Sequence, residues 1–421
     1  MKSIYLLLSI LLICVANSLS QPKSDSTGFA KPGINLYLDG IAEYDDYIRK
    51  QIDFVNYVRD RHEANIHLLI TTQLTGGGGR EYTMLYIGQM MFAGKNDTLQ
   101  YYAGSAVAED EIRQGLVQLL KMGLMPYLAR LPDAGAMEIE INFTEGESHP
   151  SEVKKHQWHD WVFTISGNCD YSGEQSYKNL YVNGGLYAKK TTEAWKFSAG
   201  LNGSYNYSRY AYDNTEYVSK TRSKSANLLV VKSITNHWSA GGTTSISASS
   251  YSNYDLQATL SPAIEWNLYP YSQSTSHLFT VLYQLTPSYA DYTDTTIYLK
   301  TAEWLASQSL TASLDLIEKW GSVNMSLYAS NYFHDFSKNA LYLSGAVNLR
   351  IVKGLEFNLY GNIGFIHDQL SLPKEGATPE EVLTRQRELA TDFNYYGSVG
   401  LSYSFGATYN NVVNARFSFL N

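Results

Sequence analysis

Hydrophobic and polar side chains alternate one by one along residues 355–365. Leu355, Phe357 and Leu359 occupy one set of positions, and polar residues such as Glu356 occupy the positions between them. Because successive side chains of an extended chain point to opposite faces, one side of this stretch is apolar and the other is polar. The pattern predicts a strand that separates an apolar environment from a polar one.

The same alternation recurs throughout the chain after residue 160. We count about twelve such segments, each near or above the ~9–11 residues that a tilted strand needs to cross a bilayer. They cover residues 161–171, 177–189, 195–208, 224–234, 238–251, 255–269, 277–289, 304–320, 322–333, 340–352, 355–367 and 393–405. Such a series is typical of an all-β, closed transmembrane barrel with antiparallel strands.

The lengths of the connections predict which end of the strands faces the periplasm. Barrels of this kind have short periplasmic turns and longer external loops. The short connections are residues 191–194, 235–237, 321 and 353–354, and the long ones are residues 210–223, 290–303 and 368–392. Four tryptophans beside the short turns predict an aromatic girdle at one membrane interface. They are Trp161, Trp195, Trp238 and Trp320.

Two further segments leave open a count of about fourteen strands. Residues 413–419 alternate once more, so residues 406–421 are either a C-terminal tail or an extra strand. Ile297 and Leu299 alternate inside a predicted loop. With either count, a closed barrel removes the free sheet edges that lipid could not tolerate.

The chain before the strands divides into four parts. Residues 1–20 predict a removed signal peptide, because a short basic start precedes an apolar run of about a dozen residues and then small residues. Residues 21–33 are expected to be a flexible leader. Residues 34–145 are long enough for a periplasmic α+β domain with its own core, and residues 146–160 read as a linker.

The elements of the α+β domain are predicted from changes in hydrophobic period. Strands are expected at residues 34–39, 66–73, 81–89, 98–102 and 137–143, and helices at residues 43–61 and 109–120. The four successive glycines at 76–79 would form a mobile hairpin tip between two strands. They lack the Gly-Lys-Ser/Thr ending of a phosphate-binding loop.

Arg59, Asp60 and Arg61 form a charged stretch at the end of a predicted helix. Charged residues in such a position are usually solvated. The alternative is a docking surface for a periplasmic protein partner, and both interpretations stay open.

The predicted external segment 373–392 differs from the other loops. Its stretch Thr378-Pro379-Glu380-Glu381 is a capping box with proline at the first helical position, which predicts a helix. That helix, with Glu381, Arg385 and Arg387, is either a lid over the barrel mouth or a solvated surface helix.

Composition narrows the range of partners. A formal net charge of −8 provides no basic surface for nucleic acid. The 35 tyrosines suit strands and membrane interfaces, so outer-membrane lipid is the expected surrounding. The mean hydropathy of −0.25 agrees with a barrel that has a polar lumen. Only Cys169 remains after signal removal, so an intramolecular disulfide is excluded.

The sequence predicts no catalytic, cofactor-binding or metal site. The nine histidines are scattered, and they form no metalloprotease or similar motif. His149, His156 and His159 fall in or beside the linker, where a solvated role is favoured over metal binding. Catalytic groups on separate strands would leave no local motif, so an outer-membrane hydrolase stays open.

The predicted lumen face carries mostly Ser, Thr, Asn, Gly and Tyr, with a few charges such as Lys196, Arg350 and Glu356. A ring of charges of one sign would indicate ion selectivity, and none is evident on this face. The leading hypothesis is an outer-membrane β-barrel that anchors a periplasmic binding or assembly domain without catalysis. The alternatives are a narrow channel for small solutes and, second, an outer-membrane hydrolase.

Five stretches resemble an uncharacterised group of two-part outer-membrane proteins of Bacteroidetes-type bacteria. They are residues 54–61, 71–83, 121–127, 380–387 and 409–417. The resemblance covers most of the mature chain and implies a small periplasmic domain before an outer-membrane barrel. It implies no substrate, cofactor or catalytic residue. Residues 418–421 extend beyond the pattern of the group, so the position of the last segment in the barrel stays open.

Overall fold

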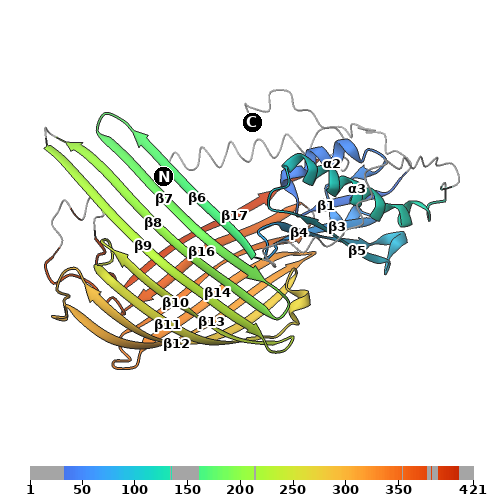
Figure 1. Cartoon of the computed structure of the whole chain (residues 1–421). Coiled ribbons are helices and arrows are strands. Elements are labelled where there is room, and N and C mark those ends of the chain that lie inside the picture. The colour runs from blue at the N-terminus through green and yellow to red at the C-terminus, as the bar shows by residue number, and fades with distance from the viewer. Residues whose placement is uncertain are drawn as a thin grey trace, which may run out of the picture.

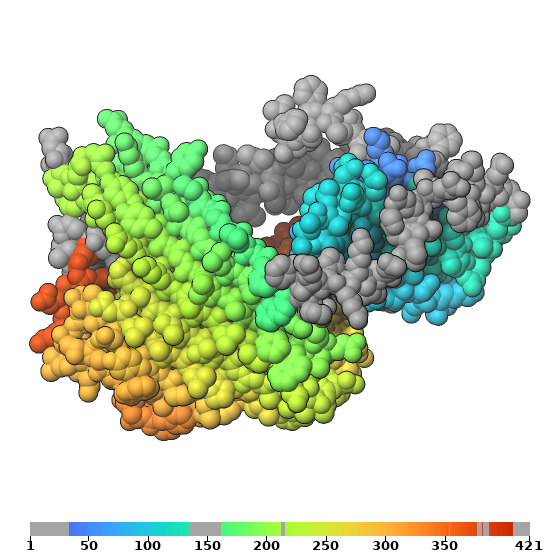
Figure 2. All heavy atoms as spheres, in the orientation of Figure 1, coloured from blue at the N-terminus to red at the C-terminus, as the bar shows by residue number. Residues whose placement is uncertain are grey.

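The computed structural model describes residues 33–132, 134, 161–212, 215–352, 354–376, 381 and 387–406. They form two parts, the N-terminal unit (residues 33–134) and the rolled sheet (residues 161–406). The N-terminal unit, in blue and teal, lies at one end of the rolled sheet (Figure 1) and beside it rather than inside it (Figure 2). The predicted signal peptide and linker lie outside the described residues, and so do the predicted leader and C-terminal tail apart from Gly33 and Gly406.

A five-stranded sheet forms the centre of the N-terminal unit, with strand order β2-β1-β3-β4-β5. Its strands are β1 (Asn35–Asp39), β2 (Asn56–Tyr57), β3 (Ile66–Leu74), β4 (Arg80–Gly88) and β5 (Asn96–Ala103). β1 pairs in parallel with β2 and β3, whereas β3, β4 and β5 are antiparallel. The helices are α2 (Asp45–Gln51) and α3 (Glu109–Leu128), and the 3-10 turns are η1 (Ala42–Tyr44), η2 (Arg61–Glu63) and η3 (Met90–Phe92).

Helix α3 packs against the sheet of the N-terminal unit. Three acids in its first turn complement the positive end of the helix dipole. Leu116 and Leu120 are fully buried in the core. A Cβ at Gly123 would lie 2.3 Å from the ring of Tyr86 on β4, so glycine is what allows this close approach. The predicted helix 109–120 is correct in position, and the structure continues it to Leu128.

The prediction of one helix over residues 43–61 is wrong in its second half. Helix α2 ends at Gln51, and the chain then runs extended as β2 beside β1. Asn56, Tyr57 and Val58 are all buried, although they are consecutive. A strand is predicted from alternating apolar and polar residues. Because consecutive residues are buried here, that alternation is missing and the strand could not be predicted. The predicted strand 137–143 lies outside the described residues.

Twelve antiparallel strands form the rolled sheet, and each pairs with its neighbours in sequence. They are β6 (Trp161–Gly173), β7 (Tyr177–Thr191), β8 (Trp195–Tyr212), β9 (Thr215–Ser233), β10 (Trp238–Ser249), β11 (Tyr254–Asn267), β12 (His277–Tyr292), β13 (Ala302–Glu318), β14 (Gly321–Tyr332), β15 (Asn339–Val352), β16 (Leu355–Ile366) and β17 (Phe393–Tyr403). The sheet curls round an interior (Figure 1). The predicted fold class, an α+β unit before about twelve antiparallel strands, is confirmed.

One predicted loop and one candidate extra strand need correction. In the loop predicted at residues 210–223, residues 210–212 and 215–223 are strand, because β8 and β9 remain paired to their ends at Tyr212 and Thr215. Polar and charged residues on both faces of this extension conceal the alternation. Residues 293–301 form a loop with an isolated bridge between Thr296 and Pro373, so they add no strand. The other candidate extra strand, at 413–419, lies outside the described residues.

The two faces of the rolled sheet differ as the alternation predicts. Leu327, Leu343 and Ile363 are cross-strand neighbours on the outer face, with exposed fractions of 43%, 39% and 39%. On the inner face, polar side chains bond to one another across strands, as Ser326 does with Ser313 at 3.3 Å. Apolar side chains therefore cover the outside of the sheet, and polar ones face its interior.

β6 and β17 are the terminal strands of the sheet, and within the part of the chain that the structure describes no pairing joins them. Unpaired backbone groups are costly in lipid, so we expect these edges to pair in a membrane. Cys169 on β6 faces outward beside Val182. A cysteine at Tyr395 or Val399 of β17 should therefore form a disulfide with Cys169, and the position that reacts reports the stagger of the closed sheet.

The disulfide is measured by non-reducing gel mobility of membrane-extracted protein. Cysteines at the inward-facing Asn394 and Tyr396 are the matched controls, and they should stay reduced. Failure of every outward-facing position of β17, including Gly397, to react would contradict closure between these two strands.

Candidate functional site

The N-terminal unit is joined to the rolled sheet by an ion pair between Asp39 and Arg350. Asp39 ends β1, and Arg350 lies on β15 near the short turn to β16. The two guanidinium nitrogens of Arg350 donate to the two carboxylate oxygens of Asp39 at 2.7 and 2.5 Å. The Asp39 side chain is 7% exposed and that of Arg350 is 27% exposed. Paired, hydrogen-bonded charges of this kind fix orientation as well as distance.

His67 holds the other side of the Asp39 carboxylate. It lies on β3, the strand next to β1, and its Nε2 is 3.0 Å from Asp39 Oδ2. The His67 ring is fully buried and packs edge-on against Tyr37 with ring centroids 5.0 Å apart. Asp39 is therefore held by the N-terminal unit on one side and by the rolled sheet on the other.

Burial opposes ionisation of Asp39, but the hydrogen bonds from His67 and Arg350 outweigh it and lower the pKa of this carboxyl. A lowered pKa in the folded state means that the pairing contributes stability above the unfolded pKa and loses it as the pH falls through the folded pKa. We expect the junction to hold at neutral pH and to weaken only below about pH 4. Limited proteolysis at a series of pH values, with Asp39→Asn as the reference, measures this.

Arg59 and Arg61 also face the rolled sheet. Arg61 donates to the backbone carbonyl of Lys319, in the turn between β13 and β14, and Arg59 donates to that of Gly406 at 3.3 Å. Asp60 is buried and instead accepts a hydrogen bond from the backbone of His62 at 2.8 Å, which caps η2. The stretch proposed as a docking surface thus contacts this chain's own sheet; docking of a separate partner stays a prediction.

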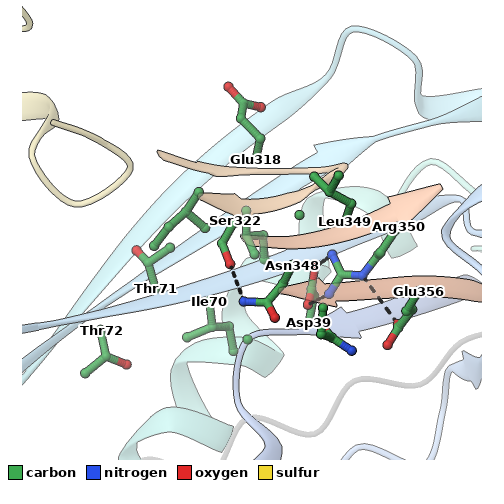
Figure 3. A pocket seen from close by; sticks show the side chains of 15 residues that line it. Asp39, Ile70, Thr71, Thr72, Glu318, Ser322, Asn348, Leu349, Arg350 and Glu356 are labelled. Carbon is green, nitrogen blue, oxygen red and sulfur yellow. Dashed lines mark hydrogen bonds and ion pairs between the residues drawn. The ribbon is translucent and has the colours of Figure 1, made fainter. Parts of the chain in front are cut away.

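A cleft of about 370 Å³ lies where the two parts meet. From the N-terminal unit come Ile70, Thr71 and Thr72, and from the rolled sheet come inward-facing residues such as Asn348 and Glu356 (Figure 3). Dashed lines in Figure 3 join Arg350 to Asp39 and, at 3.9 Å, to Glu356, and a further one joins Asn348 to Ser322. The cleft therefore opens onto the polar interior of the sheet, and Asp39, Arg350 and Glu356 of its lining pair with one another, whereas Glu318 pairs with His277.

The tip of the glycine-rich hairpin touches the rolled sheet. A Cβ at Gly76 would lie 2.2 Å from Cβ of Thr191, whereas one at Gly77 would meet nothing closer than 3.8 Å. Gly76→Ala should therefore displace the hairpin, while Gly77→Ala should leave it in place. We expect several-fold faster trypsin cleavage at Arg80 in the first variant only. Equal cleavage rates in the two variants would show that this contact does not hold the hairpin.

The four predicted girdle tryptophans lie at the end of the rolled sheet with the short turns. Their exposed fractions are 37%, 38%, 43% and 38% for Trp161, Trp195, Trp238 and Trp320. The sequence reasoning missed Trp266, which is the cross-strand partner of Trp238. Its place could have been found from the pairing of β10 with β11. That these rings lie at a membrane interface stays a prediction.

The proposed lid is described only in part. Arg387 donates to the carboxylate of Glu381 and, at 3.2 Å, to the carbonyl of Glu375. Arg385 and the capping box before Glu381 lie outside the described residues. The segment that precedes them is held inward, because Asn253 donates to the carbonyl of Ser371 at 2.7 Å. The choice between a lid and a surface helix therefore stays open for the helix itself.

No helix within the described ranges is long and apolar enough to cross a membrane. In the same residues, no group of three or more His, Cys, Asp or Glu side chains could hold a metal ion.

Comparisons with known proteins give fold-level neighbours only. No family model matches the sequence. No curated protein matches it either. A NanC porin structure aligns with 58% of this chain and 99% of its own, at 8% identity and a TM-score of 0.26. The β domain of the Bordetella autotransporter Brka aligns with 58% of this chain and 98% of its own, at 10% identity and a TM-score of 0.25. At these values neither likeness carries an argument about this chain.

Proposed function

We propose that the chain is an outer-membrane β-barrel that holds its N-terminal unit at the periplasmic end, where the unit serves as a non-catalytic binding or assembly module. The apolar outer face supports the barrel, because side chains such as Leu327 and Leu343 are exposed where lipid would cover them. The short turns and the tryptophans at one end support the orientation.

The observation that carries the anchoring role is the ion pair between Asp39 and Arg350. A domain on a flexible tether would need no buried charge pair with the barrel, because desolvating two charges is unfavourable without good geometry. Here both oxygens of Asp39 are used, and His67 adds a third contact. The N-terminal unit is therefore presented in one orientation, as a fixed platform for a partner.

A narrow channel is the second candidate, and the cleft at the junction favours it. The cleft leaves about 370 Å³ of open space between the N-terminal unit and the inward-facing residues of β14, β15 and β16. Twelve strands also enclose an interior intermediate between filled and open barrels. No observation within the described residues favours the hydrolase.

Single-channel recording of the purified full chain in planar bilayers separates the two candidates. The anchoring role predicts no steady conductance. Steady conductance that is abolished by a bulky residue on the inner face, such as Ser326→Trp, would overturn it and establish the channel. Leu327→Trp, on the outer face of the same strand, is the matched control and should leave any conductance unchanged.

A further inference from the structure

The rolled sheet contains a second cavity, at the end opposite the N-terminal unit. Its volume is about 790 Å³, within the range of small-molecule sites. The wall is formed by the ends of β11, β15 and β17, by the turn after β10 and by the segment after β16. That segment is fixed in place, because Leu370, Ser371 and Leu372 are buried and Ile297 donates to the carbonyl of Leu372 at 2.8 Å.

Aromatic rings and carboxylates meet in this cavity. Tyr251, Tyr254 and Tyr342 line it, together with Asp368 and Glu388. Asp368 interacts electrostatically with both Tyr254 and Tyr342, and so does Glu388, so the acids and the rings face one space. The π faces of aromatic rings carry partial negative charge, which attracts cations.

Within the described residues no lysine or arginine forms an ion pair with Asp368, although the adjacent His367 acts on its carboxyl electrostatically. Burial raises the pKa of its carboxyl, and a backbone hydrogen bond and His367 oppose this rise only in part. The one arginine of the cavity wall, Arg387, donates to Glu381 and to the carbonyl of Glu375. Glu388 accepts from Gln369 at 2.7 Å, a neutral donor. The described residues that line the cavity therefore include two carboxylates, Asp368 and Glu388, and one arginine that donates to Glu381 and Glu375.

We propose that this cavity binds a small organic cation carrying an alkylammonium group. The ammonium would lie against Tyr254 and Tyr342 with Asp368 as its counter-ion, and the remaining polar groups would hold the rest of the molecule. The inference does not depend on what the N-terminal unit does. Under the proposed function, with the N-terminal unit in the periplasm, the cavity would face the cell exterior, and only this orientation rests on that function.

Choline and its neutral isostere 3,3-dimethylbutan-1-ol are suitable probes, because they share a shape and differ in charge. Calorimetric titration of the detergent-solubilised full chain should detect choline binding and at least about tenfold weaker binding of the alcohol. Asp368→Asn should weaken choline binding about tenfold, and Tyr342→Leu several-fold. Asp335→Asn changes another acid of the outer loops, outside this cavity, and should leave the affinity within about twofold.

Heat-modifiable gel mobility establishes that each variant is folded before it is titrated. Absence of choline binding, equal binding of the neutral isostere, or unchanged binding in folded Asp368→Asn would each overturn the proposal. Conductance in planar bilayers is a separate readout, so loss of the anchoring role and loss of this site can be told apart.

Discussion

Replacing Arg350 with alanine should release the N-terminal unit from the rolled sheet. The change removes the group that neutralises Asp39 but leaves the carboxylate buried, with a side chain only 7% exposed. Removing one partner of a buried ion pair typically costs about 3–5 kcal/mol, because the remaining charge is uncompensated. At about 1.4 kcal/mol for each tenfold change, the detached population should rise by roughly two to three and a half orders of magnitude.

Hydrogen exchange of the backbone amides of β1 and β3 measures this release, because both strands lie beside the junction. Arg350→Lys keeps the charge but not the two-pronged geometry, so it should give an intermediate effect. Arg209→Ala is the control, since it breaks an ion pair with Glu216 that lies at the other end of the sheet. Unchanged exchange in Arg350→Ala would mean that this ion pair does not hold the two parts together.

Leu327→Arg should strongly destabilise the protein in a bilayer. Leu327 lies in the middle of β14 and is 43% exposed on the apolar face. An arginine facing lipid at the bilayer midplane costs about 2–4 kcal/mol in barrels of this kind. Folding into lipid vesicles over a urea series measures the free energy of unfolding, and the midpoint should shift to lower urea.

Ser326→Arg provides the matched control for that change. Ser326 is the preceding residue and points into the interior, where its hydroxyl lies 3.3 Å from that of Ser313. An arginine there can be hydrated, so the midpoint should move much less. Equal effects of the two substitutions would indicate a water-soluble sheet rather than a membrane-embedded one, because water would then bathe both faces.

The strands of the rolled sheet could be predicted closely because the alternation of apolar and polar residues is present within each strand. The alternation at residues 355–367 predicts β16, which spans Leu355–Ile366. It failed at the paired extension of β8 and β9, where polar and charged residues lie on both faces. In the N-terminal unit it failed at β2, whose consecutive residues are buried together.

The candidate site could not be predicted in the same way. Arg350 stood out as a charge on the inner face of a strand, but Asp39 is 311 residues away and ends an ordinary buried strand. No local pattern links them, because the contact exists only once two separately folded parts meet. The charged stretch at Arg59–Arg61 was noticed, but its contact with the sheet of the same chain was not.

Where β8 and β9 extend beyond the end of β10, β9 is paired with β8 on one side and, within the described residues, has no paired strand on the other. β10 pairs with β9 as far as Ser223, and Ser250 bonds to the backbone of Arg222, so residues 215–221 present an open strand edge. Glu216 and Lys220 are exposed along it. Charges on an open edge oppose the addition of another strand. This projection therefore discourages fibre-like stacking between neighbouring molecules through the hairpin of β8 and β9.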